Sequence, residues 1–237
     1  MIVLAIDTCD SRGSVAVLRN ESVLQVVVHD SGEDYSSWLL PAAGQALKAS
    51  GMEMGSVDGY AVAAGPGSFT GVRVGLTTVK AWGEVYGKGI AAVSRLEAIA
   101  IQAVAGSAHI AAFVDAQRGQ VFGAVFQRTR EGLERLGEEM VMPPGKFIEC
   151  AAELAKGGNI SWVSIDAAVL TSEEKWKVRE ARGEQVESIS SVLAQAIGRI
   201  GTRELAAGRF TDALSLDANY VRRSDAEIFW KGAAHGG

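Results

Sequence analysis

AGPGSFTGVRVG, residues 64–75, joins an apolar run to a segment with helical spacing. A P-loop would place a glycine and then a lysine after four intervening residues, whereas Thr70 stands at that position after Gly65. The dinucleotide pattern would also need a glycine at position 70, and Pro66 lacks the amide donor that a phosphate cradle uses. The loop is therefore not a standard phosphate-binding loop, and its role has to be inferred from the rest of the chain.

The segment after the loop, residues 71–86, is predicted to be a helix that carries three glycines along one stripe. Interior glycines cost about 0.5–1 kcal/mol each relative to alanine, so a close backbone neighbour should offset that cost. One interpretation is the chain's own first helix, expected at residues 36–50. The other is a surface that receives a partner subunit, and it predicts that Gly75→Leu weakens association while the monomer stays folded. The partner interpretation assigns to the interface Tyr35, Trp38, Leu39, Val72, Gly75, Leu76, Val79 and Gly83.

The opening pattern of the chain recurs about half a chain later. An apolar run ends at Asp7 and leads through a turn to Arg12-Gly13, and a second apolar run ends at Asp115 and leads to Arg118-Gly119. Such a repeat predicts a duplicated α/β fold with an N-terminal lobe at residues 1–106 and a C-terminal lobe at residues 107–237. No linker rich in proline or serine separates the halves, so we expect one body, with the terminal segment packing back on the first lobe.

Asp7 and Asp115 each end a buried-type strand and are the best candidates for metal-phosphate chemistry. In a duplicated fold they would face each other across a cleft that could take Mg²⁺ on a nucleotide. The other interpretation is that each carboxylate caps its own turn through backbone amides. The predicted nucleotide or phosphate contacts are Asp7, Gly65, Gly67, Ser68, Thr70 and Asp115.

No convincing catalytic set or metal site is found in the sequence. His29, His109 and His235 are isolated from one another and from cysteine, so no metal ligands are expected. Ser68 lacks the flanking glycines of a hydrolase nucleophile elbow.

Composition restricts the partners and the compartment. The net charge is −5, and no basic patch follows from the distribution of arginine and lysine, so nucleic acid is expected to be held mainly by a partner. Only Cys9 and Cys150 are present, which suits a reducing compartment. The apolar N-terminus is interrupted by Asp7 and has no basic start, so neither a signal peptide nor a membrane span is expected, and a cytoplasmic location is predicted.

Four motifs together resemble the TsaB (YeaZ) family over nearly the full length. They are residues 1–8, residues 65–73, Asp115-Ala116 with Arg118-Gly119, and Tyr220-Val221-Arg222. The resemblance implies a duplicated actin/sugar-kinase/Hsp70-like (ASKHA) fold and a role in making threonylcarbamoyladenosine beside the tRNA anticodon. The chain departs from the family pattern where Tyr35-Ser36-Ser37 replaces a common His-Ser-Glu and where Ala64 precedes the glycine loop.

The resemblance also implies partners. A larger catalytic paralogue of the same fold (TsaD-like) transfers the threonylcarbamoyl group, and a small P-loop ATPase (TsaE-like) joins the assembly. The TsaB protein itself is a non-catalytic subunit that meets tRNA only through the complex and forms a homodimer in isolation. No tightly bound cofactor is expected, and ATP or ADP is expected only at the complex interface.

Two functions are compatible with these residues, whereas a third, a peptidase, has neither metal ligands nor a nucleophile set behind it. The first is a non-catalytic scaffold in the threonylcarbamoyl transfer complex. The second is a stand-alone ATPase or phosphotransferase of the actin-like superfamily that uses Asp7 and Asp115.

Overall fold

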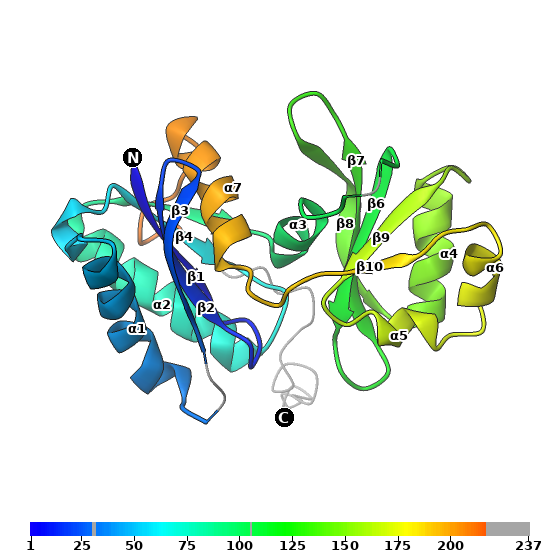
Figure 1. Ribbon diagram of the computed structural model, residues 1–237, viewed down its shortest axis with the longest axis horizontal. Coiled ribbons are helices and arrows are strands. Elements are labelled where there is room, and N and C mark those ends of the chain that lie inside the picture. The colour runs from blue at the N-terminus through cyan, green and yellow to red at the C-terminus, as the bar shows by residue number, and fades with distance from the viewer. Residues whose placement is uncertain (30–31, 105, 217–237) are drawn as a thin grey trace, which may run out of the picture.

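The chain folds around two five-stranded sheets (Figure 1). The computed structural model describes residues 1–29, 32–104 and 106–216. The Tyr220-Val221-Arg222 motif, in the terminal segment predicted to pack back on the first lobe, lies outside the described residues. No helix among those described is both long and apolar enough to cross a membrane.

The first sheet has the strand order β3-β2-β1-β4-β5. β1 runs antiparallel to β2 and parallel to β4. All five residues of β4 are buried, and β1 is buried from its second residue on, which explains why these strands are continuous apolar runs in the sequence. Helices cover the outer face of this sheet. The elements are β1 (Ile2–Asp7), β2 (Ser14–Arg19), β3 (Ser22–Val28), α1 (Tyr35–Ala49), the 3₁₀ turn η1 (Met54–Ser56), β4 (Gly59–Ala63), α2 (Phe69–Tyr86) and β5 (Gly89–Val93).

The second sheet repeats the first, strand for strand. Its order is β10-β9-β6-β7-β8, and its first strand in the chain, β6, again runs antiparallel to the next strand and parallel to the one after the meander. This correspondence confirms the duplication predicted from the two Asp-to-Arg-Gly turns. The elements are β6 (His109–Asp115), β7 (Val121–Arg128), β8 (Leu133–Met142), α4 (Pro144–Leu154), β9 (Ile160–Ser164), α5 (Ala168–Thr171), α6 (Trp176–Glu180) and β10 (Val186–Ser188).

Two helices cross from the end of one sheet to the inner face of the other. α3 (Arg95–Ala100) follows β5 but packs on the strands of the second sheet, and α7 (Ala194–Ala206) follows β10 but packs on the first sheet. Figure 1 shows both helices between the two sheets. The division of the chain at residue 106 stays a prediction.

The three glycines of α2 face the chain's own first sheet. A Cβ at Gly71 would collide with the carbonyl oxygen of Thr8, and one at Gly75 would lie 2.6 Å from Thr8 Oγ1. At Gly83 it would lie 2.9 Å from the Ile90 side chain. The close neighbours are therefore the end of β1 and the strand β5. This corrects both interpretations of the stripe, since neither the first helix nor a partner occupies it.

Gly75→Leu is accordingly expected to destabilise the monomer. The added side chain would press on Thr8 at the end of β1, and overpacking of this kind costs about 1–3 kcal/mol. Urea unfolding of the isolated chain measures the loss. Gly44→Leu is the matched control, because nothing lies within 4 Å of a Cβ at Gly44 of α1 and the leucine should improve helix propensity. Equal stabilities of the Gly75 variant and the wild type would contradict the packing described here.

Candidate functional site

A buried ion pair lies at the end of β1, where the sequence predicted metal-phosphate chemistry. The Asp7 side chain is 1 % exposed and the Arg95 side chain 2 %, and Arg95 Nε lies 3.4 Å from Asp7 Oδ2. The other Asp7 oxygen, Oδ1, accepts the Cys9 amide at 2.9 Å, so Asp7 also caps its own turn. A second carboxylate, Asp10, contacts Nη2 of the same arginine. An arginine from the start of α3 thus occupies the space between two acids.

Burial and the close charges shift the pKa values of the groups at this ion pair. Desolvation acts to lower the pKa of Arg95, but the charges of Asp7 and Asp10 outweigh it, so the pKa of Arg95 lies above its ordinary value. Burial acts to raise the pKa of Asp10, yet Arg95 and Arg12 prevail and lower it from its ordinary value of 3.8. The ion pairs of Asp10 with Arg95 and Arg12 therefore add to the free energy of unfolding at neutral pH, and this contribution is lost as the pH falls below 3.8. Burial and the neighbouring Asp7 raise the pKa of the Cys9 thiol well above its ordinary value, so Cys9 is not an activated nucleophile.

Asp115 occupies the equivalent turn of the second sheet and also caps it. Its Oδ1 accepts the Gln117 amide at 2.8 Å, and its Oδ2 accepts the Gln117 side chain at 2.9 Å. The Asp115 amide donates to Asp166 at 3.0 Å, and Asp166 in turn pairs with Arg12 of the first lobe. The structure therefore links the two predicted aspartates through side chains that lie between them.

The glycine loop packs on the β1–β2 turn. The Ser68 amide donates to the Cys9 carbonyl at 2.6 Å, and a Cβ at Gly67 would collide with the same carbonyl. The Gly65 carbonyl accepts a hydrogen bond from the Arg95 amide at 2.8 Å. Ser68 Oγ accepts the Gly71 amide at 3.4 Å and caps α2. The loop thus uses its polar groups to fix the start of α2 and the position of Arg95.

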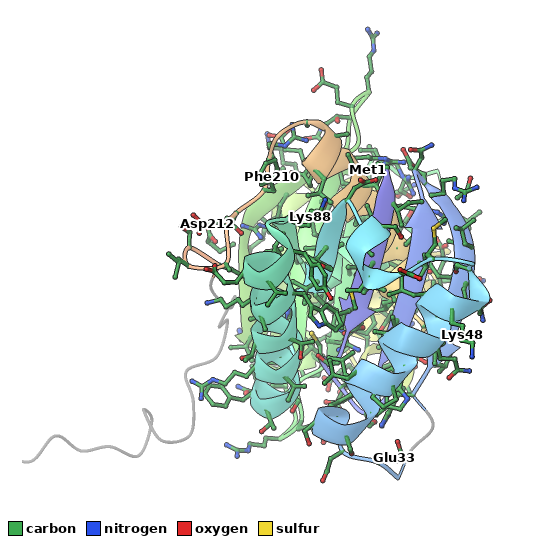
Figure 2. The ribbon with its side chains drawn as sticks, turned by 90° about the vertical axis from the view of Figure 1, so that its left-hand side faces the viewer. Met1, Glu33, Lys48, Lys88, Phe210 and Asp212 are labelled. Atoms are coloured by element: carbon green, nitrogen blue, oxygen red, sulfur yellow. The ribbon has the colours of Figure 1, made fainter. Side chains whose placement is uncertain are left out.

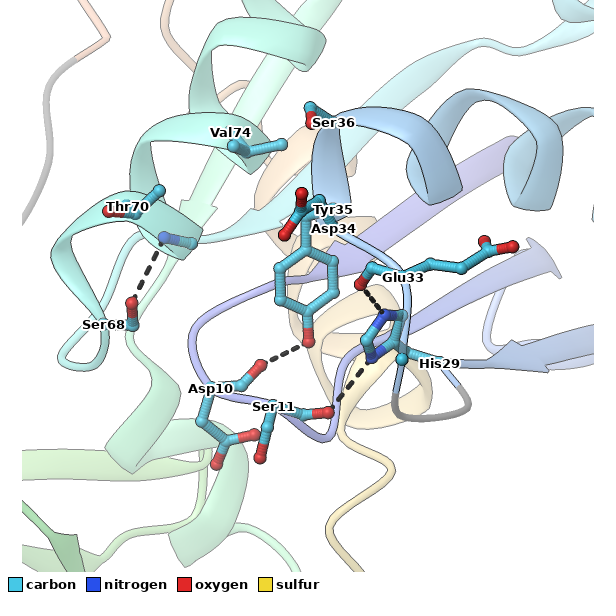
Figure 3. Close-up of a pocket in the computed structure, with 12 residues that line it drawn as sticks. Asp10, Ser11, His29, Glu33, Asp34, Tyr35, Ser36, Ser68, Thr70 and Val74 are labelled. Atoms are coloured by element: carbon cyan, nitrogen blue, oxygen red, sulfur yellow. Dashed lines mark hydrogen bonds between the residues drawn. The ribbon is translucent and has the colours of Figure 1, made fainter.

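A hollow of about 750 Å³ opens between the N-terminal ends of α1 and α2 and the β1–β2 turn (Figure 3). Tyr35 forms one wall, and its hydroxyl donates to the Asp10 carbonyl and accepts the Gly13 amide at 2.7 Å. His29 is held between the carbonyls of Ser11 and Glu33 at 3.1 and 2.9 Å. Ser68 and Thr70, two of the predicted phosphate contacts, line the opposite wall (Figure 3).

Most of the predicted partner contacts lie inside the monomer. Tyr35 is half-buried, and the other seven are buried against the first sheet: Trp38, Leu39, Val72, Gly75, Leu76, Val79 and Gly83. Trp38 and Tyr35 pack on the His29 ring, with ring centroids 4.9 and 4.5 Å away. The predicted residues therefore position α1 and α2 and do not form their outer surface.

The outer surface of α1 is poor in charge, whereas α2 exposes Arg73 and Glu84. α1 and α2 lie side by side on one face of the molecule, as Figure 2 shows. α1 exposes 58 % of Leu40 and carries no charged residue before Lys48. We call this surface the α1–α2 face and define it by the outward residues Ser37, Leu40, Pro41, Gly44, Val74, Thr77, Ala81 and Val85.

Arg95, Asp10 and Asp166 are the site residues that sequence reasoning missed. One signal pointed to Arg95. It stands in the first turn of α3, where the helix dipole disfavours a cation, so a nearby anion should have been expected. Asp166 gave no such signal, because it follows β9 in a part of the chain that no motif marked. Within residues 1–29, 32–104 and 106–216, no group of three or more His, Cys, Asp or Glu side chains is placed to hold a metal ion.

Comparison with protein families gives one match over most of the chain. The family described as "TsaD: tRNA N6-adenosine threonylcarbamoyltransferase" matches residues 25–216. The protein named "tRNA threonylcarbamoyladenosine biosynthesis protein TsaB" from Bacillus subtilis is 28% identical over 236 residues, which cover 97% of this chain and 98% of that protein. The protein of the same name from Escherichia coli is 32% identical over 149 residues, or 59% of this chain and 60% of that protein.

Solved structures give the same fold. "YeaZ from Pseudomonas aeruginosa" aligns with a TM-score of 0.73 at 22% identity and covers 92% of this chain and 99% of its own. A ROK hexokinase from Thermus thermophilus aligns with a TM-score of 0.51 at 13% identity and covers 87% of this chain and 100% of its own. These matches confirm the duplicated actin/sugar-kinase/Hsp70-like fold that the sequence predicts.

Proposed function

We propose, from the premise that the chain belongs to the TsaD-type tRNA N6-adenosine threonylcarbamoyltransferase family and to its TsaB/YeaZ group, that it is the non-catalytic subunit of a threonylcarbamoyl transfer complex. In this proposal a larger paralogue performs the transfer to the tRNA adenosine beside the anticodon. The chain supports that paralogue by binding it, and it meets tRNA only within the complex.

The observation that carries the non-catalytic role is the buried Asp7–Arg95 pair. A metal-nucleotide site needs a carboxylate with oxygens free to ligate the cation. Here one oxygen of Asp7 caps a turn and the other lies 3.4 Å from a buried guanidinium. An arginine in that position supplies the positive charge that a metal would otherwise bring, so catalysis at Asp7 is not favoured.

The α1–α2 face supports the partner role. Helices exposed to water normally carry many charged residues on their outer side, whereas the outer side of α1 presents Leu40, Pro41 and Gly44. We assign this face to the TsaD-like paralogue and, in its absence, to a second copy of the chain. A TsaE-like ATPase completes the assembly.

We place any nucleotide at the interface of the complex. The hollow at the start of α2 offers Ser68 and Thr70, and it lies beside the proposed interface, so ATP or ADP held there would be shared with the paralogue. Tight binding by this chain alone is not proposed, because the amide of Ser68 is already used within the protein. A stand-alone ATPase or phosphotransferase is the less favoured function for the same reasons.

Reconstitution tests the proposal. Purified paralogue, P-loop ATPase, threonylcarbamoyl adenylate and tRNA are mixed with and without this chain, and modified adenosine is measured by mass spectrometry. We expect modification to depend on the chain. Full modification in its absence would refute the scaffold role. ATP hydrolysis by the chain alone that disappears in Asp7→Ala would favour the phosphotransferase.

A further inference from the structure

We propose that Arg12 is an interlobe latch that fixes the angle between the two lobes without a ligand between them. Its guanidinium bridges Asp10, in the β1–β2 turn of the first lobe, and Asp166, which follows β9 in the second lobe. This inference rests on the geometry of these three residues and is independent of the function proposed above.

The contacts have the form of a strong ion pair. Arg12 Nη2 lies 2.6 Å from Asp10 Oδ2, and Nη1 lies 2.9 Å from Asp166 Oδ1. Nη2 also lies 3.5 Å from Asp166 Oδ2, so the planar fork faces both oxygens of that carboxylate. Bidentate arginine–carboxylate pairs constrain orientation as well as distance. The three side chains are 19–39 % exposed, so water and salt reach them only partly.

Both ends of the bridge are fixed within their own lobes. Asp10 contacts the buried Arg95 and accepts the Arg12 amide at 2.7 Å. Asp166 accepts the Asp115 amide at 3.0 Å, and its own amide donates to Ser164 Oγ at 2.8 Å. Because other contacts fix both carboxylates within their own lobes, a movement of one lobe relative to the other must stretch the Arg12 contacts.

The bridge differs in kind from other attachments between the lobes. α3 and α7 carry the chain from one lobe to the other and pack on each other within one apolar core that includes residues of both sheets, so their contribution is apolar packing. Arg12 and Asp166 are 154 residues apart and join two turns that no covalent crossover links at that point. Two-domain proteins commonly close around a bound ligand. In this chain the Arg12 guanidinium, in place of a bound ligand, joins the two lobes.

Distances between labels on the two lobes test the latch. Cysteines replace the exposed Leu24 of β3 and Val178 of α6 in a Cys150→Ser background, and spin labels report the distance distribution by pulsed electron resonance. Cys9 is buried and stays unlabelled. We expect Arg12→Gln and Asp166→Asn each to shift the distribution to a different mean and to broaden it. The labelled wild type should show a smaller change in the same direction in 1 M NaCl, because the pair is partly exposed and the screening length falls to about 3 Å.

Arg203→Gln is the matched control. Arg203 of α7 makes an equally close pair with Glu21, at 3.0 and 2.6 Å, but both residues belong to the structure packed on the first sheet. Its loss should leave the interlobe distance unchanged. Circular dichroism verifies that every variant is folded. Distributions that match the wild type in both latch variants and in high salt would overturn the proposal, and an equal shift in Arg203→Gln would overturn it as well.

Discussion

Arg95→Met is expected to lower the free energy of unfolding by about 3–5 kcal/mol, because removing one partner of a buried ion pair leaves the other charge uncompensated. Domains of this kind are stable by only about 5–15 kcal/mol, so the variant should lose a large part of its stability. Asp7, at 1 % exposure, would have neither a cation nor water on its Oδ2 side. Urea unfolding followed by circular dichroism measures the effect.

Two variants separate the pair from general damage. Asp7→Asn combined with Arg95→Met removes the buried charge as well as its partner, and it should be more stable than Arg95→Met alone. Arg19→Met changes an exposed arginine at the end of β2 and should stay within about 0.5 kcal/mol of the wild type. A loss below about 1 kcal/mol in Arg95→Met would show that Asp7 is compensated by other groups.

The fold could be predicted because its signals are local and occur twice. Buried strands such as β1 and β4 are continuous apolar runs, and the turn after β1 recurs after β6 with an aspartate and an Arg-Gly pair. The crossing of α3 and α7 could not be predicted in the same way. A helix with one apolar face packs equally well on either sheet as far as its own sequence is concerned.

The candidate site was only partly predictable for a related reason. The glycine spacing in α2 correctly indicates a close neighbour, but spacing along one helix does not say which element that neighbour is, and nothing in it points to Thr8 at the end of β1. Asp7 was found because it ends a strand. Its partner Arg95 is 88 positions further along the chain, and only folding brings the two together.

Apolar residues at helical spacing correctly indicate which side of a helix is buried, but they do not say what covers that side. Val72, Leu76 and Val79 were assigned to a partner because they share one side of α2, yet that side packs on the first sheet. A buried core and a buried interface have the same composition. The distinction comes from the opposite side of α1, where the lack of charge before Lys48 is the informative feature.

Leu40→Asp should weaken binding of the TsaD-like paralogue by about 2 kcal/mol, or roughly 30-fold in Kd, if the α1–α2 face is the interface. Leu40 is 58 % exposed in the isolated chain, so a charge there costs the monomer little, whereas in a complex it would lie buried among apolar groups. Isothermal titration calorimetry with the purified paralogue measures the affinity, and urea unfolding verifies that the monomer keeps its stability.

Val178→Asp provides the comparison on the other lobe. Val178 of α6 is 62 % exposed, so the substitution is matched in exposure and introduced charge but lies outside the α1–α2 face. We expect it to bind the paralogue as the wild type does. Self-association should follow the same order, because we assign the homodimer to the same face, and sedimentation velocity would show Leu40→Asp as a monomer. If Val178→Asp lost affinity and Leu40→Asp kept it, the interface would have to lie on the second lobe.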